Sequence, residues 1–528
     1  HFTFTLSESL SFIINPILLI LQHLVSLTVR NQCPYRDLAD LLLKQNRVLE
    51  AQQVLDLLKV QELDDYLKNV RGNSETAKGI ELLESEQRFI VDYSAIQNRY
   101  IQASKESVDI YKLTQSNRSL EQKQRLRELV SLQERTLRQL DSFVQNPSVS
   151  SILKQIGQSD DRASNLANLQ QFTTLQNNLQ RFPQKTAIFY PLVLEDRLEL
   201  ILVTATGTPI RRTVSVKKEQ LNQAIADFRA DVRDASSVDI LNSSQQLYAW
   251  LIQPIANDLQ KAGVQTIIYA PDGQLRYLPI AALYDGKQWL VELYAINTIT
   301  AASLTNLGDR SPKSPPRVLA GAFTTGKYVF EVNGKTFSFT GLPFAGKEVE
   351  NLVAKLPNSV KFIDRDFSVN STIAKFKQYN IIHLATHAAF VTGKPEDSFV
   401  MFGDGSYASL RDVSTWSLKN VDLVILSACE TGLGGKLGNG TEIMGFGYQM
   451  EYAGAKAAIA SLWQVSDGGT QTLMEAFYDV LQDSTLTKAE VLAKAQRSMI
   501  HQKSTDNSQS FNHPYFWSPF IIIGNGLL

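Results

Sequence analysis

The stretch Val421–Gly432 (VDLVILSACETG) decides the fold prediction. Its apolar part is typical of a strand buried on both faces of a sheet, and it carries Cys429, one of two cysteines in the chain, to the start of a glycine-rich loop. A second such run, Ile381–His387 (IIHLATH), ends in His387, one of six histidines. Because parallel strands end at the same edge of a sheet, we expect thiol and imidazole to meet there as a cysteine nucleophile and its base.

The segments around these two runs alternate between apolar strands and helices. This alternation predicts an α/β fold with a mostly parallel sheet covered by helices on both faces. The predicted strands are 186–192, 198–204, 264–269, 318–322, 360–363, 381–385, 421–428, 457–463 and 520–523. The predicted helices are 246–261, 345–355, 369–378, 441–452, 469–481 and 488–500. His387 and Cys429 are expected just past the ends of their strands.

Length and composition limit the class of protein. A chain of 528 residues exceeds one ordinary core, and its 20% charged and 44% hydrophobic residues are typical of a water-soluble protein. A net charge of −1 gives no electrostatic reason to expect a nucleic-acid partner. Two cysteines fit a reducing cytoplasm, and no metal-ligand spacing is present, so we expect no cofactor and no metal.

The N-terminal third predicts a helical region. Residues 34–182 are rich in leucine, glutamine and charged side chains, and the spacing from Ala39 to Leu55 is typical of a tetratricopeptide helix pair with its turn at 45–47. A spacing near 3.5 in 126–144 predicts a long amphipathic helix. The uncharged stretch 9–29 is long enough to span a membrane, but its polar residues favour a buried helix, so a membrane location is not the main prediction.

Several single residues allow a plainer interpretation. A lone cysteine at a strand end is most often a small core residue, so the role of Cys429 depends on its pairing with His387. His383 is the competing base, yet its apolar flanks favour a buried, hydrogen-bonded histidine. The five glycines of residues 432–440 resemble a phosphate cradle but lack the Gly-Lys-Ser/Thr of a P-loop, which favours a mobile loop beside the nucleophile.

Four motifs together resemble the CHAT family, caspase-like domains found mostly in bacteria and often joined to tetratricopeptide repeats. The motifs are 382–387 (IHLATH), 426–432 (LSACETG), 460–467 (ASLWQVSD) and 513–520 (HPYFWSPF). The resemblance extends back to Thr186 and implies a non-catalytic caspase-like half there. Together with the helical composition of 34–182 and the Ser- and Pro-rich run at 308–316, it predicts the division 1–182 helical region, 183–307 non-catalytic caspase-like half, 308–317 linker and 318–528 catalytic half.

The family implies a cysteine endopeptidase of the caspase, separase and gingipain group. Carried over by motif, His387 is the catalytic histidine and Cys429 the nucleophile. The oxyanion is then held by the backbone N–H groups of Cys429 and Ala388, where the family usually has glycine in place of the alanine. The expected partners are a protein or peptide substrate and a protein activator acting through the helical region.

Substrate specificity is expected from the loop after the next strand. Asp467 is the best match for a carboxylate that receives a basic P1 side chain, and its plainer role is a helix N-cap. Glu442 and Asp404 are weaker candidates, while Trp463 and Gln464 are expected to line a groove in which an extended substrate adds as a strand. Two other classes stay open: a non-proteolytic interaction scaffold with a caspase-like module, and a different thiol enzyme such as an acyltransferase.

Overall fold

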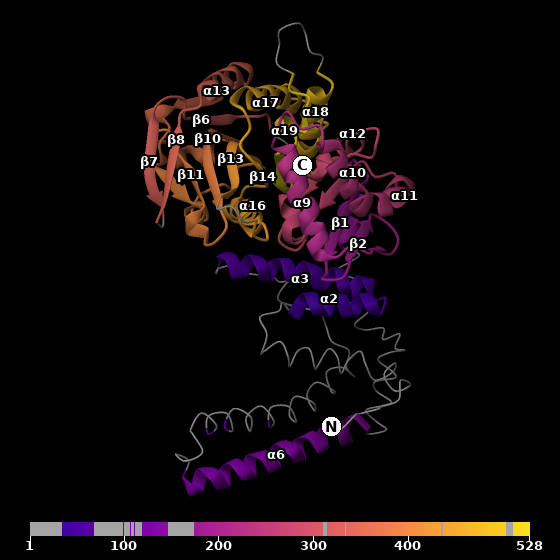
Figure 1. Cartoon of the computed structure of the whole chain (residues 1–528). Helices are drawn as coiled ribbons and strands as arrows, with labels where there is room; N and C mark the ends of the chain where they lie inside the picture. Colours follow the sequence, from indigo (N-terminus) through magenta and orange to yellow (C-terminus); the bar gives the residue numbers. More distant parts are fainter. Residues whose placement is uncertain are drawn as a thin grey trace. The chain divides into compact units, whose positions relative to one another are not determined.

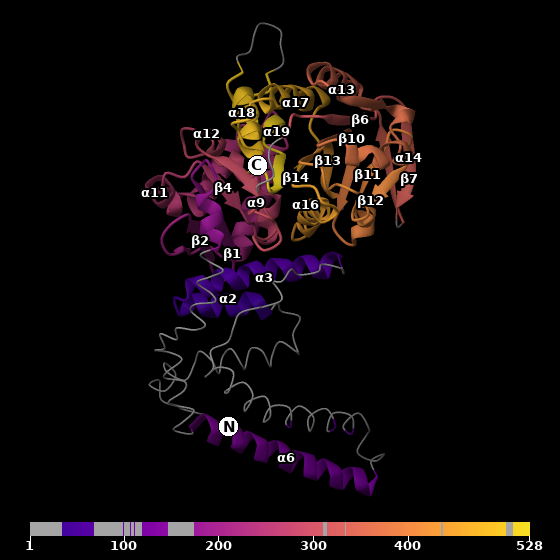
Figure 2. The same ribbon diagram turned by 180° about the vertical axis from the view of Figure 1, so that it is seen from behind.

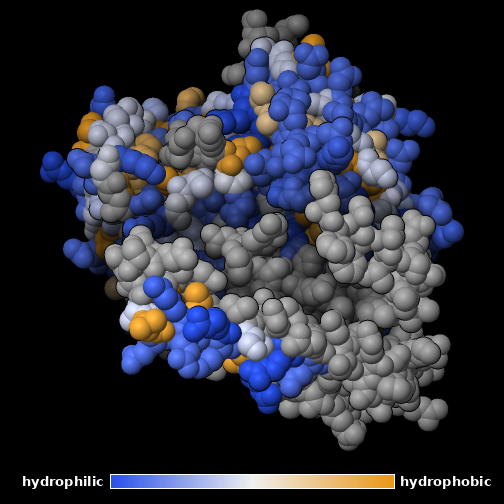
Figure 3. Space-filling view, turned by 60° about the horizontal axis from the view of Figure 1, so that its bottom comes forward, coloured by the Kyte–Doolittle hydropathy of each residue, from blue (hydrophilic) through white to orange (hydrophobic). Residues whose placement is uncertain are grey.

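The structure, a computed structural model, describes residues 34–67, 99, 106, 110, 119–145, 174–309, 314–332, 334–433, 437–502 and 510–527. Contacts divide the chain into two compact units, one of residues 1–37 and 80–172 and one of residues 38–79 and 173–528. On the face drawn in Figure 3, the coloured residues are mainly hydrophilic, and apolar residues occur singly or in small groups.

The larger unit is built on one continuous sheet of 13 strands. Along its main path the strands follow the order β12-β11-β10-β13-β14-β15-β5-β4-β1-β2-β3, and β6 and β9 extend it beside β10 (Figure 1). The strands are β1 (Thr186–Val193), β2 (Leu198–Thr204), β3 (Ile210–Val214), β4 (Thr266–Tyr269), β5 (Ala295–Thr298), β6 (Val318–Ala322), β9 (Val360–Ile363), β10 (Ile381–Val391), β11 (Phe399–Met401), β12 (Tyr407–Ser409), β13 (Leu423–Leu433), β14 (Ala457–Ser461) and β15 (Phe520–Gly524). A separate antiparallel hairpin is formed by β7 (Lys327–Val332) and β8 (Lys335–Thr340).

The strands β4, β5, β6, β9, β10, β13 and β14 pair in parallel with neighbours, while β15 runs antiparallel to β14 and parallel to β5. β15 therefore joins the strands of the N-terminal half to those of the C-terminal half in one ladder. The observed fold, a largely parallel sheet between helices with a helical segment before it, confirms the predicted fold class. The predicted domain boundaries at 182, 308 and 318 stay a prediction.

Helices cover both faces of the C-terminal half of the sheet (Figure 2). Alternate residues of a strand face opposite sides, and on β10 the side chain of His383 meets α13 and α17 while Leu384 packs in one cluster with Phe446 of α16. The main helices of this unit are α9 (Lys218–Val232), α10 (Ile240–Leu251), α11 (Gln253–Ala262), α12 (Leu290–Leu293), α13 (Pro343–Lys355), α15 (Leu410–Val413), α16 (Thr441–Ala453), α17 (Asp467–Leu481), α18 (Lys488–Ile500) and α19 (Pro514–Trp517).

The predicted helix pair near the N-terminus is present as α2 (Pro34–Lys44) and α3 (Val48–Leu67). Its turn lies at 45–47, where Asn46 has a φ of 59°, a left-handed conformation that asparagine tolerates well. Whether this pair is a tetratricopeptide unit stays a prediction. α3 packs against α16 and β1, beneath both halves of the sheet in Figure 1.

The long helix predicted around 126–144 is α6 (Leu120–Gln145), in the smaller unit. None of the helices in the described part of the chain is long and apolar enough to cross a membrane. The candidate span 9–29 lies outside the described residues.

Two predicted helices are broken in the structure. The segment 246–261 is divided at Ile252 into α10 and α11, because Pro254 has no N–H to continue the hydrogen-bond ladder. The segment 369–378 forms one α-helical turn, α14 (Val369–Thr372), followed by the 3₁₀ helix η5 (Ile373–Gln378). The sequence analysis did not predict the β7–β8 hairpin.

Candidate active site

The two candidate catalytic residues lie on neighbouring parallel strands. In the register of β10 and β13, His387 is paired with Ala428 and Ala388 with Cys429. Neighbouring strands lie about 4.8 Å apart, so the backbones of His387 and Cys429 are one register position from each other across a single strand spacing. The structure thus pairs the two predicted strands, with Ala388 opposite Cys429, and the meeting of thiol and imidazole stays a prediction.

Both strands continue beyond the points at which they were expected to end. β10 extends to Val391 and β13 to Leu433, so His387 and Cys429 lie within the strands and not just past their ends. Residues 386–391 carry Thr, Ala, Phe and Val, which fit a buried strand, and β11 pairs with β10 at Ala388 and Ala389 to support the extension. Between Leu384 and His387, β10 has one residue more than the facing part of β13, a bulge of the kind that often adjoins active sites.

A backbone carbonyl fixes the tautomer of His387. Its Nε2 lies 2.8 Å from the carbonyl oxygen of Thr340, which can only accept, so Nε2 carries the proton and donates. Nδ1 is therefore the nitrogen left with a lone pair. The ring is 5% exposed and stacks on Phe339, with centroids 4.7 Å apart. Burial lowers the pKa of His387, and the hydrogen bond to Thr340 offsets part of this effect, so the ring favours the neutral form that a base requires.

His383 has the structural environment that its apolar flanks predicted. It is completely buried, with Nε2 2.6 Å from a carboxylate oxygen of Glu348 and Nδ1 2.9 Å from the hydroxyl of Tyr478. Both ring nitrogens are occupied by side chains from α13 and α17. The ring therefore has no nitrogen available for proton transfer.

The proposed oxyanion donor at Ala388 lies inside the sheet. Ala388 has Val400 of β11 as its partner on one side and Cys429 of β13 on the other. An in-strand N–H points to one of its two neighbours, so this group can reach a substrate oxygen only if the pairing opens at this position.

The residues expected to bind substrate occupy different environments. Gln464 is exposed and lines a cavity together with His387. Trp463 is 1% exposed and donates from its indole N–H to the carbonyl of Tyr515, so its ring packs in the interior and does not line the groove. This burial corrects the expectation for Trp463.

Asp467 is not the N-cap of its helix. The cap of α17 is Ser466, whose hydroxyl accepts from the N–H of Gly469. Asp467 instead accepts from the N–H of Phe344 at 3.0 Å, in the first turn of α13. Partial burial raises the pKa of Asp467, and the Phe344 hydrogen bond opposes that rise.

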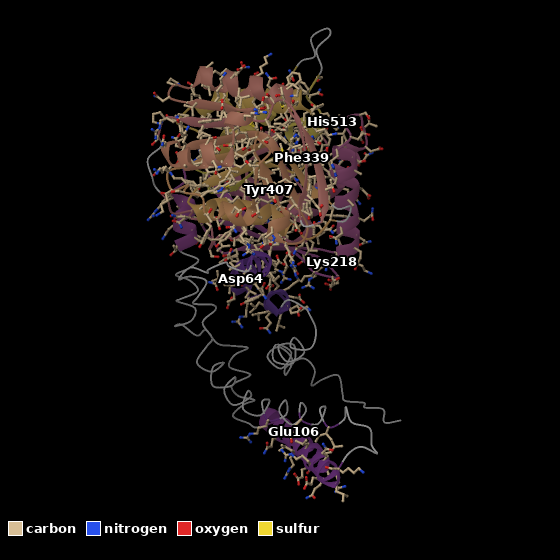
Figure 4. The ribbon with its side chains drawn as sticks, turned by 90° about the vertical axis from the view of Figure 1, so that its left-hand side faces the viewer. Asp64, Glu106, Lys218, Phe339, Tyr407 and His513 are labelled. Atoms are coloured by element: carbon tan, nitrogen blue, oxygen red, sulfur yellow. The ribbon has the colours of Figure 1, made fainter. Side chains whose placement is uncertain are left out.

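The cavity beside His387 has a volume of about 630 Å³. The β8 segment Lys335–Leu342 forms one wall, and His387, Val391 and Gln464 complete it. Figure 4 views the molecule from the side of β7 and β8 and marks Phe339, the residue stacked on the histidine. The cavity is open to solvent, and its lining combines apolar side chains with a few polar groups, as ligand sites commonly do.

The loop that follows Cys429 is held at its far end by two adjacent residues of the 3₁₀ helix η2 (Gly273–Tyr277). Arg276 donates to the carbonyl of Asn439 at 3.0 Å, and the Tyr277 hydroxyl accepts from the N–H of Gly438 at 3.1 Å. Gly440 has a φ of 72°, and a Cβ there would come within 2.4 Å of Arg276. This close approach requires glycine.

The two weaker specificity candidates have other partners. Glu442 is 1% exposed and accepts from the Tyr277 hydroxyl at 2.5 Å, and burial raises its pKa. Asp404 accepts from the N–H of Ser406 at 3.0 Å and stabilises a local turn. In the described ranges, no group of His, Cys, Asp and Glu side chains is arranged to hold a metal ion.

Sequence reasoning missed the histidine's backbone partner. Any residue type at 340 has a carbonyl group, so no residue pattern marks it. The aromatic pair Phe337 and Phe339 before it was the available signal, since alternating aromatics indicate a strand with one buried face.

A comparison with known families identifies the domain in which these residues lie. The CHAT domain model matches residues 241–525, from α10 to β15. The chain belongs to the CHAT-domain family. Within this CHAT domain lie His387, Cys429 and every predicted specificity residue. No curated protein matches the chain.

Solved structures similar to this CHAT-domain protein include a complex of RgpB and a separase–securin complex. The complex of the Porphyromonas gingivalis RgpB pro- and mature domains is 12% identical, with 59% of this chain and 78% of that chain covered and a TM-score of 0.34. The Saccharomyces cerevisiae separase–securin complex at 2.6 Å is 9% identical, with 97% and 46% covered and a TM-score of 0.39. The chain thus spans less than half of that separase chain.

Proposed function

We propose that the protein is a cysteine endopeptidase in which Cys429 is the nucleophile and His387 the base. The observation that supports this most directly is the hydrogen bond from His387 Nε2 to the Thr340 carbonyl. It leaves Nδ1 as the proton acceptor on β10, the strand that pairs with the one carrying Cys429. Because the register sets Ala388, and not His387, opposite Cys429, the proposal requires the pairing to open here so that thiol and imidazole reach one face. Membership of the CHAT family adds support.

In the proposed reaction, each proton moves through Nδ1 of His387. Nδ1 of His387 removes the thiol proton, and the thiolate attacks the scissile carbonyl, forming a C–S bond. The imidazolium then gives that proton to the leaving amine as the C–N bond breaks. Water, deprotonated by the same nitrogen, hydrolyses the thioester and restores the thiol. Thr340 holds the ring in one tautomer and orientation throughout, as an orienting third group does.

The test is active-site labelling of the full chain with a peptidyl acyloxymethyl ketone, followed by mass spectrometry of the modified peptide. We expect modification of Cys429, with the His387→Ala variant labelled at least 100-fold more slowly. Cys33→Ala is the matched control, because it removes the only other thiol. Equal labelling of wild type and His387→Ala would remove the histidine from its role.

We also propose that the helical region gates the site through α3. Three side chains of α3, spaced by three residues, contact segments that adjoin the sheet: Asp56, Lys59 and Glu62. We name them the α3 polar row. Asp56 accepts from the N–H groups of Ala302 and Ser303 at 2.7 and 2.9 Å. Lys59 is 2% exposed and donates to the carbonyls of residues 270 and 271 at 2.9 and 2.6 Å.

The third member of the α3 polar row, Glu62, connects the helix through Arg276 to the loop that follows Cys429. Glu62 forms an ion pair with Arg276, and Arg276 binds the Asn439 carbonyl after the Cys429 strand. A partner that moves α3 would change the support of this loop. The paired N–H of Ala388 is consistent with a closed resting state that such a movement opens.

A second candidate is the non-proteolytic scaffold, favoured by one observation. Both catalytic strands remain paired past His387 and Cys429, so the sheet is closed where an oxyanion hole is expected. Labelling separates the two: a scaffold leaves Cys429 unmodified at every reagent concentration at which Cys33 reacts.

A further inference from the structure

In the part of the chain that the structure describes, the hairpin β7–β8 turns a strand edge without a strand partner toward the candidate active site. In the antiparallel register Lys327 faces Thr340, and Gly341 donates to the carbonyl of Gly326 at 2.9 Å. Hydrogen-bonded and non-hydrogen-bonded pairs alternate along such a ladder. The next hydrogen-bonded pairs therefore involve Phe339 and Phe337, whose backbone groups point to β7.

The backbone groups of the intervening residues point the other way. Thr340, Ser338 and Thr336 direct their N–H and C=O groups away from β7, and the Thr340 carbonyl confirms this by reaching His387. In the described part of the chain, β8 has β7 as its only strand partner. The outward groups of Ser338 and Thr336 therefore form a short open edge.

This open edge borders the cavity that contains His387. Residues 335–342 form one wall of the cavity, with Gln464 among the other lining residues. The side chains at 336, 338 and 340 are exposed, while Phe339 is buried against the histidine. An extended polypeptide laid in the cavity would meet backbone donors and acceptors at strand spacing, as in binding by strand addition.

The order of the catalytic groups indicates which part of a substrate reaches this edge. The acyl carbon must lie at Cys429 on β13, and the leaving amine must lie at His387, which receives and returns the proton. The chain beyond that amine continues past the histidine toward Thr340 and β8.

We propose that the open edge of β8 binds the substrate segment on the amine side of the scissile bond as an added strand. The inference rests on the proposed peptidase function. The occupant is an extended, unfolded polypeptide, recognised mainly through its backbone, so the edge selects for lack of structure and not for one side chain.

The hairpin supplies a matched pair of variants. Ser338→Pro removes one N–H from the open edge without touching the ladder, since position 338 is not hydrogen-bonded to β7. Val329 faces Ser338 in the register, is 61% exposed and lies on the outer edge of the same hairpin. Val329→Pro therefore makes the same change on the edge away from His387. Thr336→Pro is a second variant of the open edge.

The first measurement is binding of fluorescein-labelled β-casein to the full chain carrying Cys429→Ala. We expect Ser338→Pro and Thr336→Pro to weaken binding roughly three- to tenfold, the range for one lost hydrogen bond, and Val329→Pro to leave it unchanged. Equal affinity in all variants, equal loss in Val329→Pro, or no casein binding at all would overturn the proposal.

The second measurement separates the two sides of the scissile bond and the two proposals. In the chain with Cys429 intact, Ser338→Pro should slow casein cleavage three- to tenfold. It should not change labelling by the acyloxymethyl ketone, which has no residues beyond the reactive carbon. Equally slowed labelling would place the edge on the acyl side and refute the inference. Casein that binds through β8 but is never cut would refute the peptidase function and retain the docking edge.

Discussion

Replacement of Arg276 by methionine tests the connection between α3 and the loop after Cys429. The guanidinium is 3% exposed and Glu62 is 16% exposed, so the change leaves a largely buried carboxylate without its cation. Breaking one partner of a buried pair costs about 3–5 kcal/mol. Loss of the bond to the Asn439 carbonyl adds about 0.5–1.5 kcal/mol. The remaining exposure of Glu62 lowers the first cost, so we expect about 3–4 kcal/mol in total.

The assay is native-state hydrogen exchange of the amides of residues 437–442, which reports the free energy of local opening. Arg276→Met should lower that free energy by the stated amount, limited by the stability of the segment itself. The double variant with Glu62→Leu should recover about 1.5 kcal/mol or more, because it also removes the carboxylate that has lost Arg276.

The matched control is Lys355→Met, which removes a surface pair with Asp479 whose side chains are 39% and 59% exposed. It should change exchange at 437–442 by less than about 0.5 kcal/mol. Unchanged exchange in Arg276→Met, or additive effects in the double variant, would refute the connection.

Four further predictions concern the site and its surroundings. Since burial lowers the pKa of His387, the acidic limb of cleavage or labelling should lie below pH 6.5, and Phe339→Ala should move it up toward 6.5. Because the pKa of His387 is lower in the folded than in the unfolded chain, the free energy of unfolding should decrease as the pH falls below 6.5. The loss is complete once the pH is below the pKa of the folded protein, and unfolding measurements in a pH series check it. Asp467→Asn should abolish a preference for Arg or Lys at P1 in a peptide-library profile if its carboxylate recognises the substrate, and an unchanged profile would limit it to supporting α13. Glu348→Ala should lower the free energy of unfolding by about 1–3 kcal/mol yet leave the labelling rate of Cys429 unchanged, because it unpairs the structural His383 and not the base; a rate loss above tenfold would contradict this.

The strands that carry the site could be predicted because their apolar runs are continuous. The runs 381–387 and 421–428 are mainly apolar, which indicates strands buried on both faces, and the alternation of strands and helices in the rest of this half indicates a parallel sheet. The structure pairs the two runs as β10 and β13, although no helix was predicted between them. The predicted ends of these strands were wrong, because residues 388–391 continue the parallel pairing with β13, and 388 and 389 also pair with β11 on the other side.

Other features of the site have no sequence signal of their own. The partner of His387 is a carbonyl, and the position of Asp467 depends on the first turn of α13, more than 120 residues earlier. Trp463 was expected in the groove beside Asp467, but its indole N–H donates to the Tyr515 carbonyl and the ring packs in the interior. Tertiary packing, and not local preference, decided each of these cases.

The strand β15 has a consequence for the order of assembly during synthesis on the ribosome. It closes the sheet between β14 and β5, yet residues 520–524 are translated more than 200 residues after β5. Until those residues emerge, the two halves have no shared ladder, and such long-range closure is slow. A nascent or prematurely terminated chain therefore lacks the strand that joins the two halves of the sheet. The strand that carries Cys429 can become part of the complete sheet, and its thiol reactive, only after residues 520–524 have been translated.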